Sequence, residues 1–136
     1  MKAAYNQVIN PKNMGKIKNK KRYHYDSEGK YLIQTSQFLD GKRHGLTIFY
    51  YKSGNKLGEL EFKNGLKHGK SIEWNEDGNK RIEMFFENNQ VHGEYKSWWE
   101  NGKLKEHGFF NRGKKIGEYR WYKKDGSLWS EHDYGE

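Results

Sequence analysis

Glycine recurs every 24 residues along most of this chain, and this period constrains the fold more than any single residue does. A fixed period between about 20 and 50 residues indicates one supersecondary unit repeated along the chain, each copy burying apolar surface of the next. One place in the three columns holds Asn89, and Asn replaces Gly where the backbone is left-handed. The columns are Gly54, Gly78, Gly102 and Gly126; Gly45, Gly69, Gly93 and Gly117; and Gly41, Gly65 and Gly113 with Asn89.

Aromatic residues follow the same period. One column holds Phe38, Phe62, Phe86, Phe110 and Tyr134, and another holds Tyr50, Trp74, Trp98 and Tyr122. The copies are residues 45–68, 69–92, 93–116 and 117–136, after a partial copy at about 23–44. In that partial copy Gly29 and Phe38 are nine residues apart instead of eight. One inserted residue therefore predicts a bulge or a longer turn there.

Each copy has the pattern of a β-hairpin. Runs of aromatic and β-branched residues flank Asp-Gly or Asn-Gly pairs, which supply the positive φ that hairpin turns need. Only 32% of residues are hydrophobic, yet the chain has 5 Trp, 10 Tyr and 7 Phe, enough large rings to cover one face of a sheet. We predict an all-β protein, an elongated single antiparallel sheet of stacked hairpins, with about five repeats in residues 23–136.

Nearly all of the net charge of +8 belongs to residues 1–22. This basic N-terminal arm contains seven Lys and Arg residues and no acidic residue, whereas residues 23–136 are almost neutral. The arm is either a solvated tail or a contact for an acidic protein surface, anionic lipid or RNA. Its candidate binding residues are Lys18, Lys20, Lys21 and Arg22.

Large rings that vary between repeats are the candidates for a partner-binding face. With an odd number of residues in the hairpin loop, residues 48 and 50 share a face with 58, 60 and 62, so we expect both aromatic columns on one face. The other face then holds large rings that do not recur in every repeat, which are either cross-strand packing or an exposed anchor for a protein. These candidates are Tyr51, Phe85, Trp99, Phe109, Trp121 and Trp129.

The histidine column formed by His44, His68 and His92 predicts packing in the connections, not a metal site. Equivalent atoms in successive repeats are separated by two strands, about 9 to 10 Å, too far for shared coordination of one ion. The sequence contains no nucleophile elbow, H-E-x-x-H motif or phosphate-binding glycine loop, and its zero cysteines exclude thiolate ligands. We therefore expect a non-enzymatic protein with no cofactor and no metal.

The segments KNGLKHGKSIEWNEDGN, NQVHGEYKSWWENGKL and NRGKKIGEYRWYKKDGSL resemble MORN repeats, specifically the bacterial variant found in YwqK-family antitoxins. This resemblance covers about residues 23–134. It implies a sheet of antiparallel hairpins and an antitoxin or immunity role, in which the protein binds a toxin directly. Eukaryotic relatives imply scaffolding and membrane-associated roles instead.

The leading hypothesis is a protein-binding module that neutralises a cognate bacterial toxin or effector protein. The alternative is a scaffold or membrane-surface adaptor that binds anionic lipid through the basic arm. Nucleic acid is an unlikely partner, because the repeat body has almost no net charge to attract a polyanion. Pairing between open sheet edges would produce a homodimer. The N-terminal sequence lacks the apolar run of a signal peptide, which favours the cytoplasm.

Overall fold

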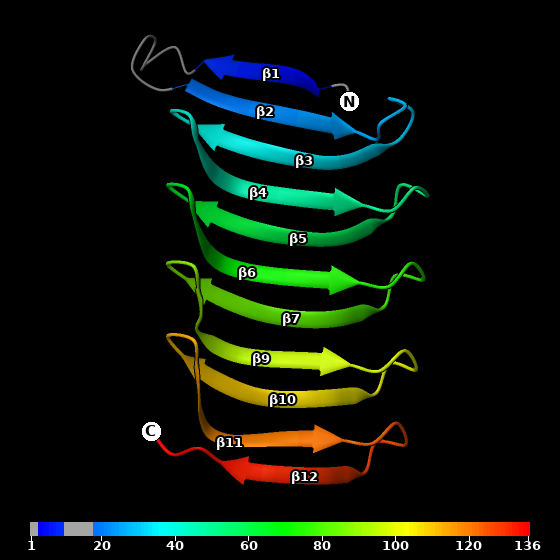
Figure 1. Ribbon diagram of the computed structural model, residues 1–136, viewed down its shortest axis with the longest axis vertical. Coiled ribbons are helices and arrows are strands. Elements are labelled where there is room, and N and C mark those ends of the chain that lie inside the picture. Colours follow the sequence, from blue (N-terminus) through cyan, green and yellow to red (C-terminus); the bar gives the residue numbers. More distant parts are fainter. Residues whose placement is uncertain (1–2, 10–17) are drawn as a thin grey trace.

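The computed structural model describes the backbone of residues 3–9 and 18–136, and the side chains from residue 19 onward. One open antiparallel sheet runs through it, and the order of strands in space follows the order in the chain (Figure 1). The two-residue strand β8 pairs only with β7. The predicted all-β sheet of stacked hairpins is confirmed. The strands are β1 (Ala3–Ile9), β2 (Lys18–Tyr25), β3 (Leu32–Leu39), β4 (Lys42–Tyr50), β5 (Lys56–Lys63), β6 (Leu66–Trp74), β7 (Lys80–Glu87), β8 (Gln90–Val91), β9 (Gly93–Trp98), β10 (Leu104–Asn111), β11 (Lys114–Tyr122) and β12 (Leu128–Asp133).

Tight turns connect the hairpins along one side of the sheet (Figure 1). Both central residues of these turns have positive φ, as in type I′ turns, for example Asn64 (50°) and Gly65 (85°). Asn89 has a φ of 70°, so the predicted left-handed backbone at this position is confirmed. Arg112 occupies the position of Asn64 in the last of these turns, with a φ of 47°.

Longer loops lie along the opposite side. In the loop 51–55, the backbone N–H of Tyr51 donates to the carbonyl of Asn55 at 2.9 Å, and the same bond recurs 24, 48 and 72 residues later. The first loop is one residue longer, since the N–H of Asp26 donates to the carbonyl of Tyr31 at 2.8 Å. The residue inserted in the partial copy therefore lengthens a turn.

A β-bulge follows each of these long loops and decides which residues share a face. Phe49 pairs with Gly58, but the next residue, Tyr50, pairs with Lys56, so Leu57 is an extra residue. The loop has an odd number of residues, as predicted, but the bulge shifts the register by one and exchanges the faces. The prediction that the two aromatic columns share a face is therefore wrong.

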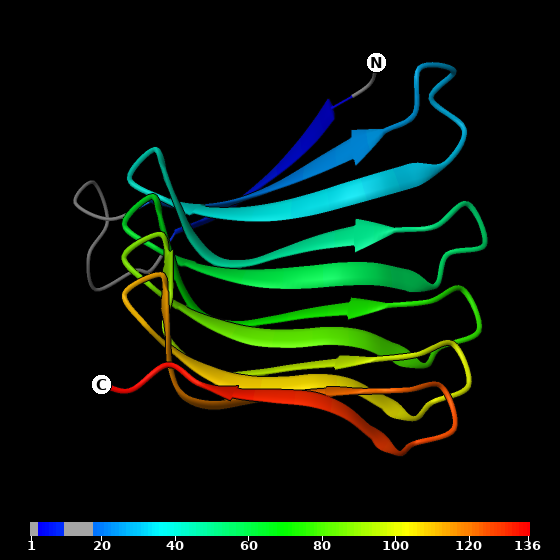
Figure 2. The same cartoon turned by 60° about the horizontal axis from the view of Figure 1, so that its bottom comes forward.

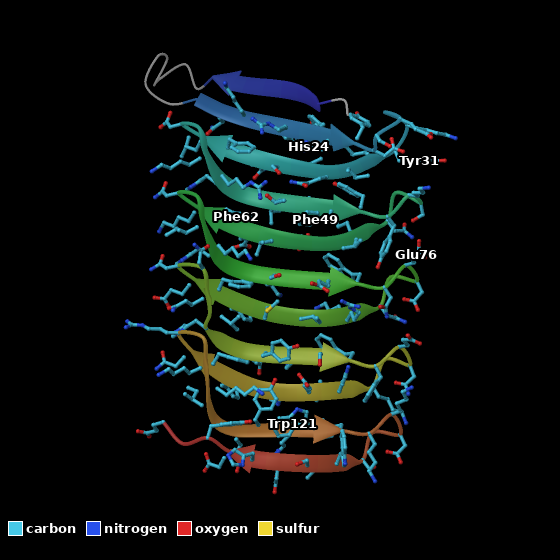
Figure 3. All side chains as sticks on the ribbon, viewed as in Figure 1. His24, Tyr31, Phe49, Phe62, Glu76 and Trp121 are labelled. Carbon is cyan, nitrogen blue, oxygen red and sulfur yellow. The ribbon has the colours of Figure 1, made fainter. Side chains whose placement is uncertain are left out.

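We call the two sides of the sheet face A and face B. Face A carries the Phe38 column, together with Phe49 and Trp121. Figure 3 labels Phe49, Phe62 and Trp121 on this face. Face B carries the Tyr50 column between rows of charged side chains. On face A, a cation from the neighbouring strand covers rings of the column: Arg22 lies 4.8 Å from Phe38, Arg43 lies 5.3 Å from Phe62 and Lys67 lies 5.3 Å from Phe86.

The sheet is curved and has a single layer (Figure 2), and few of its described side chains are buried. Ile72 and Tyr119 are the buried hydrophobic residues of the described chain, and the other buried side chains are small and polar. Those polar residues are Thr35, Ser36, Thr47, Ser71 and Ser97. Because no second layer covers either face, neighbouring strands provide the burial, and small residues fit where large neighbours lean over them.

Hydrogen bonds between successive repeats hold both sides of the stack. On the tight-turn side, the N–H of Gly65 donates to the carbonyl of Arg43 at 2.7 Å, and the N–H of Gly113 donates to that of Val91 at 2.8 Å. On the long-loop side, the Tyr51 hydroxyl donates to the carbonyl of Trp74 at 2.8 Å. The repeats are therefore fixed relative to one another, as in other repeat proteins stabilised by neighbour contacts.

The basic arm is partly a strand of the sheet. Residues 18–22 belong to β2, which pairs with β1 and β3, so the residue 22 boundary falls within a strand. Lys2, Lys12 and Lys16 lie outside the described residues. In the described part of the chain, no helix is long and apolar enough to cross a membrane.

Candidate functional site

Tyr51 and Trp99, two of the predicted partner-binding residues, connect adjacent loops. Tyr51 bonds to the carbonyl of Trp74, and the Trp99 indole N–H donates to the carbonyl of Tyr122 at 3.1 Å. Both bonds span 23 residues, from one long loop to the end of the strand before the next. Both side chains are half-buried, so each has a structural role besides any contact with a partner.

Phe85 and Phe109 lie on face B, away from the other candidates. Phe85 pairs with Lys70, and Phe109 pairs with Glu94 and Ile116. Phe109 is 43% exposed, and its ring lies 5.5 Å from that of His107. The expectation that all variable rings share one face is wrong, because the bulge that follows each long loop exchanges the faces.

Trp121 and Trp129 lie together at the C-terminal end of the sheet and line one hollow with Ser130. Trp129 is the extra residue of the last bulge, since Trp121 pairs with Ser130 and Tyr122 with Leu128. A bulge residue is free of the ladder and turns outward, which explains why Trp129 is 69% exposed. This pair is the part of the predicted aromatic surface that the structure brings together.

Three further side chains complete this cluster, and none of them was among the predicted partner-binding residues. Tyr119 is 2% exposed, and its ring lies 4.7 Å from Trp121 and 6.2 Å from Tyr134. The Lys115 ammonium lies 4.4 Å from Tyr119, 5.4 Å from Trp121 and 5.6 Å from Tyr134. We call the surface formed by Lys115, Trp121, Trp129 and Tyr134 over Tyr119 the terminal aromatic patch.

Burial and a neighbouring acid perturb the tyrosine at the base of this patch. Its hydroxyl donates to the carboxylate of Glu106 at 3.2 Å. Desolvation, followed by the negative charge of Glu106, raises the pKa of Tyr119 well above its ordinary value of 10.0. Tyr119 therefore stays protonated and supports the exposed rings as a packing residue.

The described basic residues of β2 do not form one surface. Lys20 and Arg22 pair with Phe38 and Ser36 on face A, whereas Lys21 pairs with Gln37 on face B. The side chain of Lys18 lies outside the described residues. Lys21 lies 5.3 Å from the ring of Tyr23, and Arg22 covers Phe38. The strand therefore presents positive charge to both sides of the sheet.

Charged residues on face B form ion pairs within and between strands. Glu83 lies 2.7 Å from Lys80 and 3.7 Å from Lys70, and Glu94 lies 3.0 Å from His107. The hydrogen bond from Lys80 holds the pKa of Glu83 below its ordinary value, and the bond with His107 does the same for Glu94. These carboxylates stay ionised, so none has the raised pKa of a general acid.

Two members of the histidine column accept hydrogen bonds from the tight turns, whereas Nδ1 of the third, His68, has no hydrogen-bond partner among the described residues. Nδ1 of His44 accepts from the N–H of Asn64 at 3.2 Å, and Nδ1 of His92 accepts from that of Arg112 at the same distance. This is a structural role in the connection between repeats. Within the described residues, no group of three His, Asp and Glu side chains is placed to hold a metal ion.

Comparison with known families agrees with this geometry. Residues 43–64, 67–88 and 91–112 each match the family model of the MORN repeat variant. Three segments of the chain are therefore similar to repeats of this variant type. Each matched MORN unit contains a first strand, a long loop, a second strand and the start of the next tight turn. No curated protein matches the chain significantly.

MORN repeats are generally binding motifs for proteins or membranes, and proteins built from them are typically non-catalytic. The repeats of this chain fit that description, because they present two broad faces and two rows of loops. The resemblance to YwqK-family antitoxins remains a prediction, and so do the cytoplasmic location and edge pairing.

Proposed function

We propose that this protein is a non-enzymatic binding module that acts as an antitoxin or immunity protein and neutralises a bacterial toxin by direct contact. The observation that carries this proposal is the terminal aromatic patch. Exposed rings of this size anchor protein interfaces, and Trp is enriched among the residues that contribute most to binding. The partner is a protein whose surface receives Trp129.

Exposed large apolar side chains gather at the C-terminal end of the described sheet. Of the six that are exposed, four lie between residues 109 and 134: Phe109, Leu128, Trp129 and Tyr134. Trp129 and Tyr134 belong to the terminal aromatic patch, whereas Leu128 and Phe109 lie on face B. Trp129 is 69% exposed, whereas the equivalent Leu57 is 37% exposed, which supports a contact at this end.

The rigidity of the sheet also supports neutralisation of a toxin, because a rigid sheet can cover a surface of its partner. Hydrogen bonds connect the repeats along both sides of the sheet, so little conformational entropy is lost when the sheet binds. A rigid sheet of this kind obstructs an active site, or separates an enzyme from its substrate, without any chemistry of its own.

Binding to anionic lipid is the alternative, and the placement of β2 gives it less support. Lys20 and Lys21 lie on opposite faces of the sheet, so a membrane that touches one face meets only part of the positive charge of β2. A flat membrane surface attracts a polybasic segment best when its cations point the same way.

Capture followed by growth assays tests the proposal. The full chain is used to capture proteins from a lysate of its source organism, and each captured protein is expressed alone in a bacterial host. We expect one of them to arrest growth and expect co-expression of this chain to restore it. Trp129→Ala should abolish this rescue, whereas Phe109→Ala, which removes an exposed ring from face B, should not.

The proposal fails if no captured protein inhibits growth, or if Trp129→Ala and wild type rescue equally. Because Trp129 is 69% exposed, its replacement should leave the fold intact, and circular dichroism of the variant checks this. Binding to vesicles that contain phosphatidylserine, without capture of a toxic protein, would favour the lipid alternative.

A further inference from the structure

A hollow on the long-loop side of the sheet has the composition of an anion-binding site. It lies among the loops that follow β6, β9 and β11. We call it the loop hollow. Its main lining residues are Arg81, Trp98, Trp99, Glu100, Lys105 and Lys124.

Two lysine ammonium groups lie close to one ring in this hollow. The Lys105 ammonium lies 4.6 Å from the centre of the Trp99 ring, and that of Lys124 lies 5.5 Å from it. Because both cations contact the same ring, they are separated by no more than about one Debye length, roughly 10 Å at 0.1 M salt. The ring attracts each cation, but their mutual repulsion is only partly screened, so an anion that contacts both of them relieves it.

Hydrogen bonds hold the two loops in place. The Trp99 indole N–H donates to the carbonyl of Tyr122, which fixes the ring. The side-chain amide of Asn101 donates to the carbonyl of Lys124 at 2.7 Å, and the Lys103 ammonium donates to that of Asp125 at 2.9 Å. The cations therefore project from a preorganised backbone, which lowers the entropic cost of binding.

The described acidic residues near the hollow do not form ion pairs with either lysine, so both ammonium groups can bind an added anion. Among the described residues, neither Lys105 nor Lys124 lies within ion-pair distance of an acid. Arg81 is paired with Glu73 at 2.8 Å, and Glu106 accepts from Tyr119. Glu100 lines the hollow and offsets part of its charge.

We infer that the loop hollow binds a side-chain carboxylate of the protein partner, from an Asp or Glu on an exposed segment. This inference rests on the proposed function and adds the chemistry of a second contact. The two ammonium groups donate charge-assisted hydrogen bonds to the carboxylate oxygens. A protein segment fits better than a polyanion, because residues 23–136 have almost no net charge to concentrate nucleic acid.

The other two matched repeats do not have this combination of residues. The positions equivalent to Trp99 and Lys105 are Tyr51 and Leu57 in the first matched repeat and Asn75 and Arg81 in the second. At the other end of the sheet, Lys30 and Lys52 lie 5.1 and 5.6 Å from the ring of Tyr31. That second lysine pair around a ring provides a matched control.

Titration with short peptides tests the inference without the toxin. The probes are an acetylated and amidated tetraglutamate peptide, the corresponding tetralysine peptide and inorganic phosphate. The readout is the indole N–H signal of Trp99 in a two-dimensional ¹⁵N NMR spectrum, assigned with Trp99→Phe. We expect a saturable shift with tetraglutamate only. The double variant K105Q/K124Q should weaken it by about fivefold or more, whereas K30Q/K52Q should not.

The inference is overturned if tetraglutamate leaves the Trp99 signal unchanged, if phosphate shifts it equally, or if both double variants weaken binding to the same extent. An unchanged Trp98 indole signal in K105Q/K124Q shows that the fold survives. Because these titrations need no toxin, their failure is distinguishable from failure of the growth assay, which tests the proposed function by itself.

Discussion

The two halves of the sheet fill the centre of face A in opposite ways. In the N-terminal half, small residues lie on β4 and β6 and large ones on β5 and β7: Thr47 pairs with Leu60, and Ser71 with Leu60 and Met84. In the C-terminal half, Gly108 on β10 pairs with Tyr95 on β9, and the ring of Tyr119 from β11 covers it. The large residues have moved to the first strand of each hairpin.

This difference shows that the repeat preserves the combined volume of neighbouring side chains, not the residue at each position. Thr47, Ser71, Tyr95 and Tyr119 occupy equivalent positions, and so do Leu60, Met84 and Gly108. Neither column is uniform, but each small residue has a large cross-strand neighbour, as close packing requires. In the C-terminal half, the large residue Tyr119 lies beneath Trp121 and Tyr134. Its position on the first strand of the hairpin therefore provides the base of the terminal aromatic patch.

The largest effect is expected when the C-terminal pair is converted to the N-terminal type. Tyr119→Ser alone should lower the free energy of unfolding by about 3 kcal/mol, because it removes a buried ring. Gly108→Leu alone should cost about 2 kcal/mol, because its side chain collides with the Tyr119 ring. In the double variant, the introduced leucine side chain fills the lost ring volume, so the combined loss should be smaller than the sum by about 1 to 3 kcal/mol.

Urea unfolding of wild type, the two single variants and the double variant measures the coupling energy between Tyr119 and Gly108. Tyr134→Ser is the control, because Tyr134 is 41% exposed and has little volume to exchange with Gly108. If the double variant loses as much free energy of unfolding as the two single variants together, the two positions do not exchange side-chain volume.

Much of this fold follows from the sequence, because the features that define it are local and repeated. The 24-residue spacing gives the repeat unit, and the Asn-Gly and Asp-Gly pairs give the turns. The left-handed backbone at Asn89 and the longer first loop were both predicted from departures from the period. A residue that departs from the repeat pattern therefore predicts a local change in the backbone, even when only one sequence is known.

The face on which each side chain lies could not be predicted, and neither could the site. One extra residue in a bulge moves every side chain after it to the opposite face of the sheet. Neither Leu57 nor Trp129 carries a turn signal that marks it as an extra residue. The same bulge explains why Phe85 and Phe109 lie on face B, apart from the terminal aromatic patch. The pairing of Tyr95 and Tyr119 with Gly108 is a contact between strands, and repeat columns alone do not reveal it.

The two halves should also differ, by a smaller amount, in how their contribution to stability changes at alkaline pH. The pKa of Tyr119 is raised in the folded protein, so its stabilising contribution is complete below the ordinary value of 10.0 and is lost as pH rises above it. The equivalent residues Thr47 and Ser71 do not titrate in this range. We expect Tyr119→Phe to unfold more easily than wild type at pH 8, and to lose less stability between pH 8 and 11.

Urea midpoints at several pH values measure this slope. Tyr134→Phe serves as the control, since it removes an exposed phenol from the same cluster. Equal slopes for wild type and Tyr119→Phe would mean that burial of Tyr119 does not control alkaline stability.

The smallest effect is expected at the tight turns, where the two halves also differ. The first central position is Asp40, Asn64 and Asn88 in the earlier turns but Arg112 in the last, and all four have positive φ. Asn and Asp tolerate this left-handed backbone better than other residues with a Cβ atom, so Arg112→Asn should stabilise the protein by about 0.5 kcal/mol. The reciprocal change Asn64→Arg should destabilise it similarly, because the side chain of Arg112 is exposed and the backbone preference dominates. Thermal unfolding measures both, and a loss of stability in Arg112→Asn would show that the arginine side chain itself holds the last turn against the sheet.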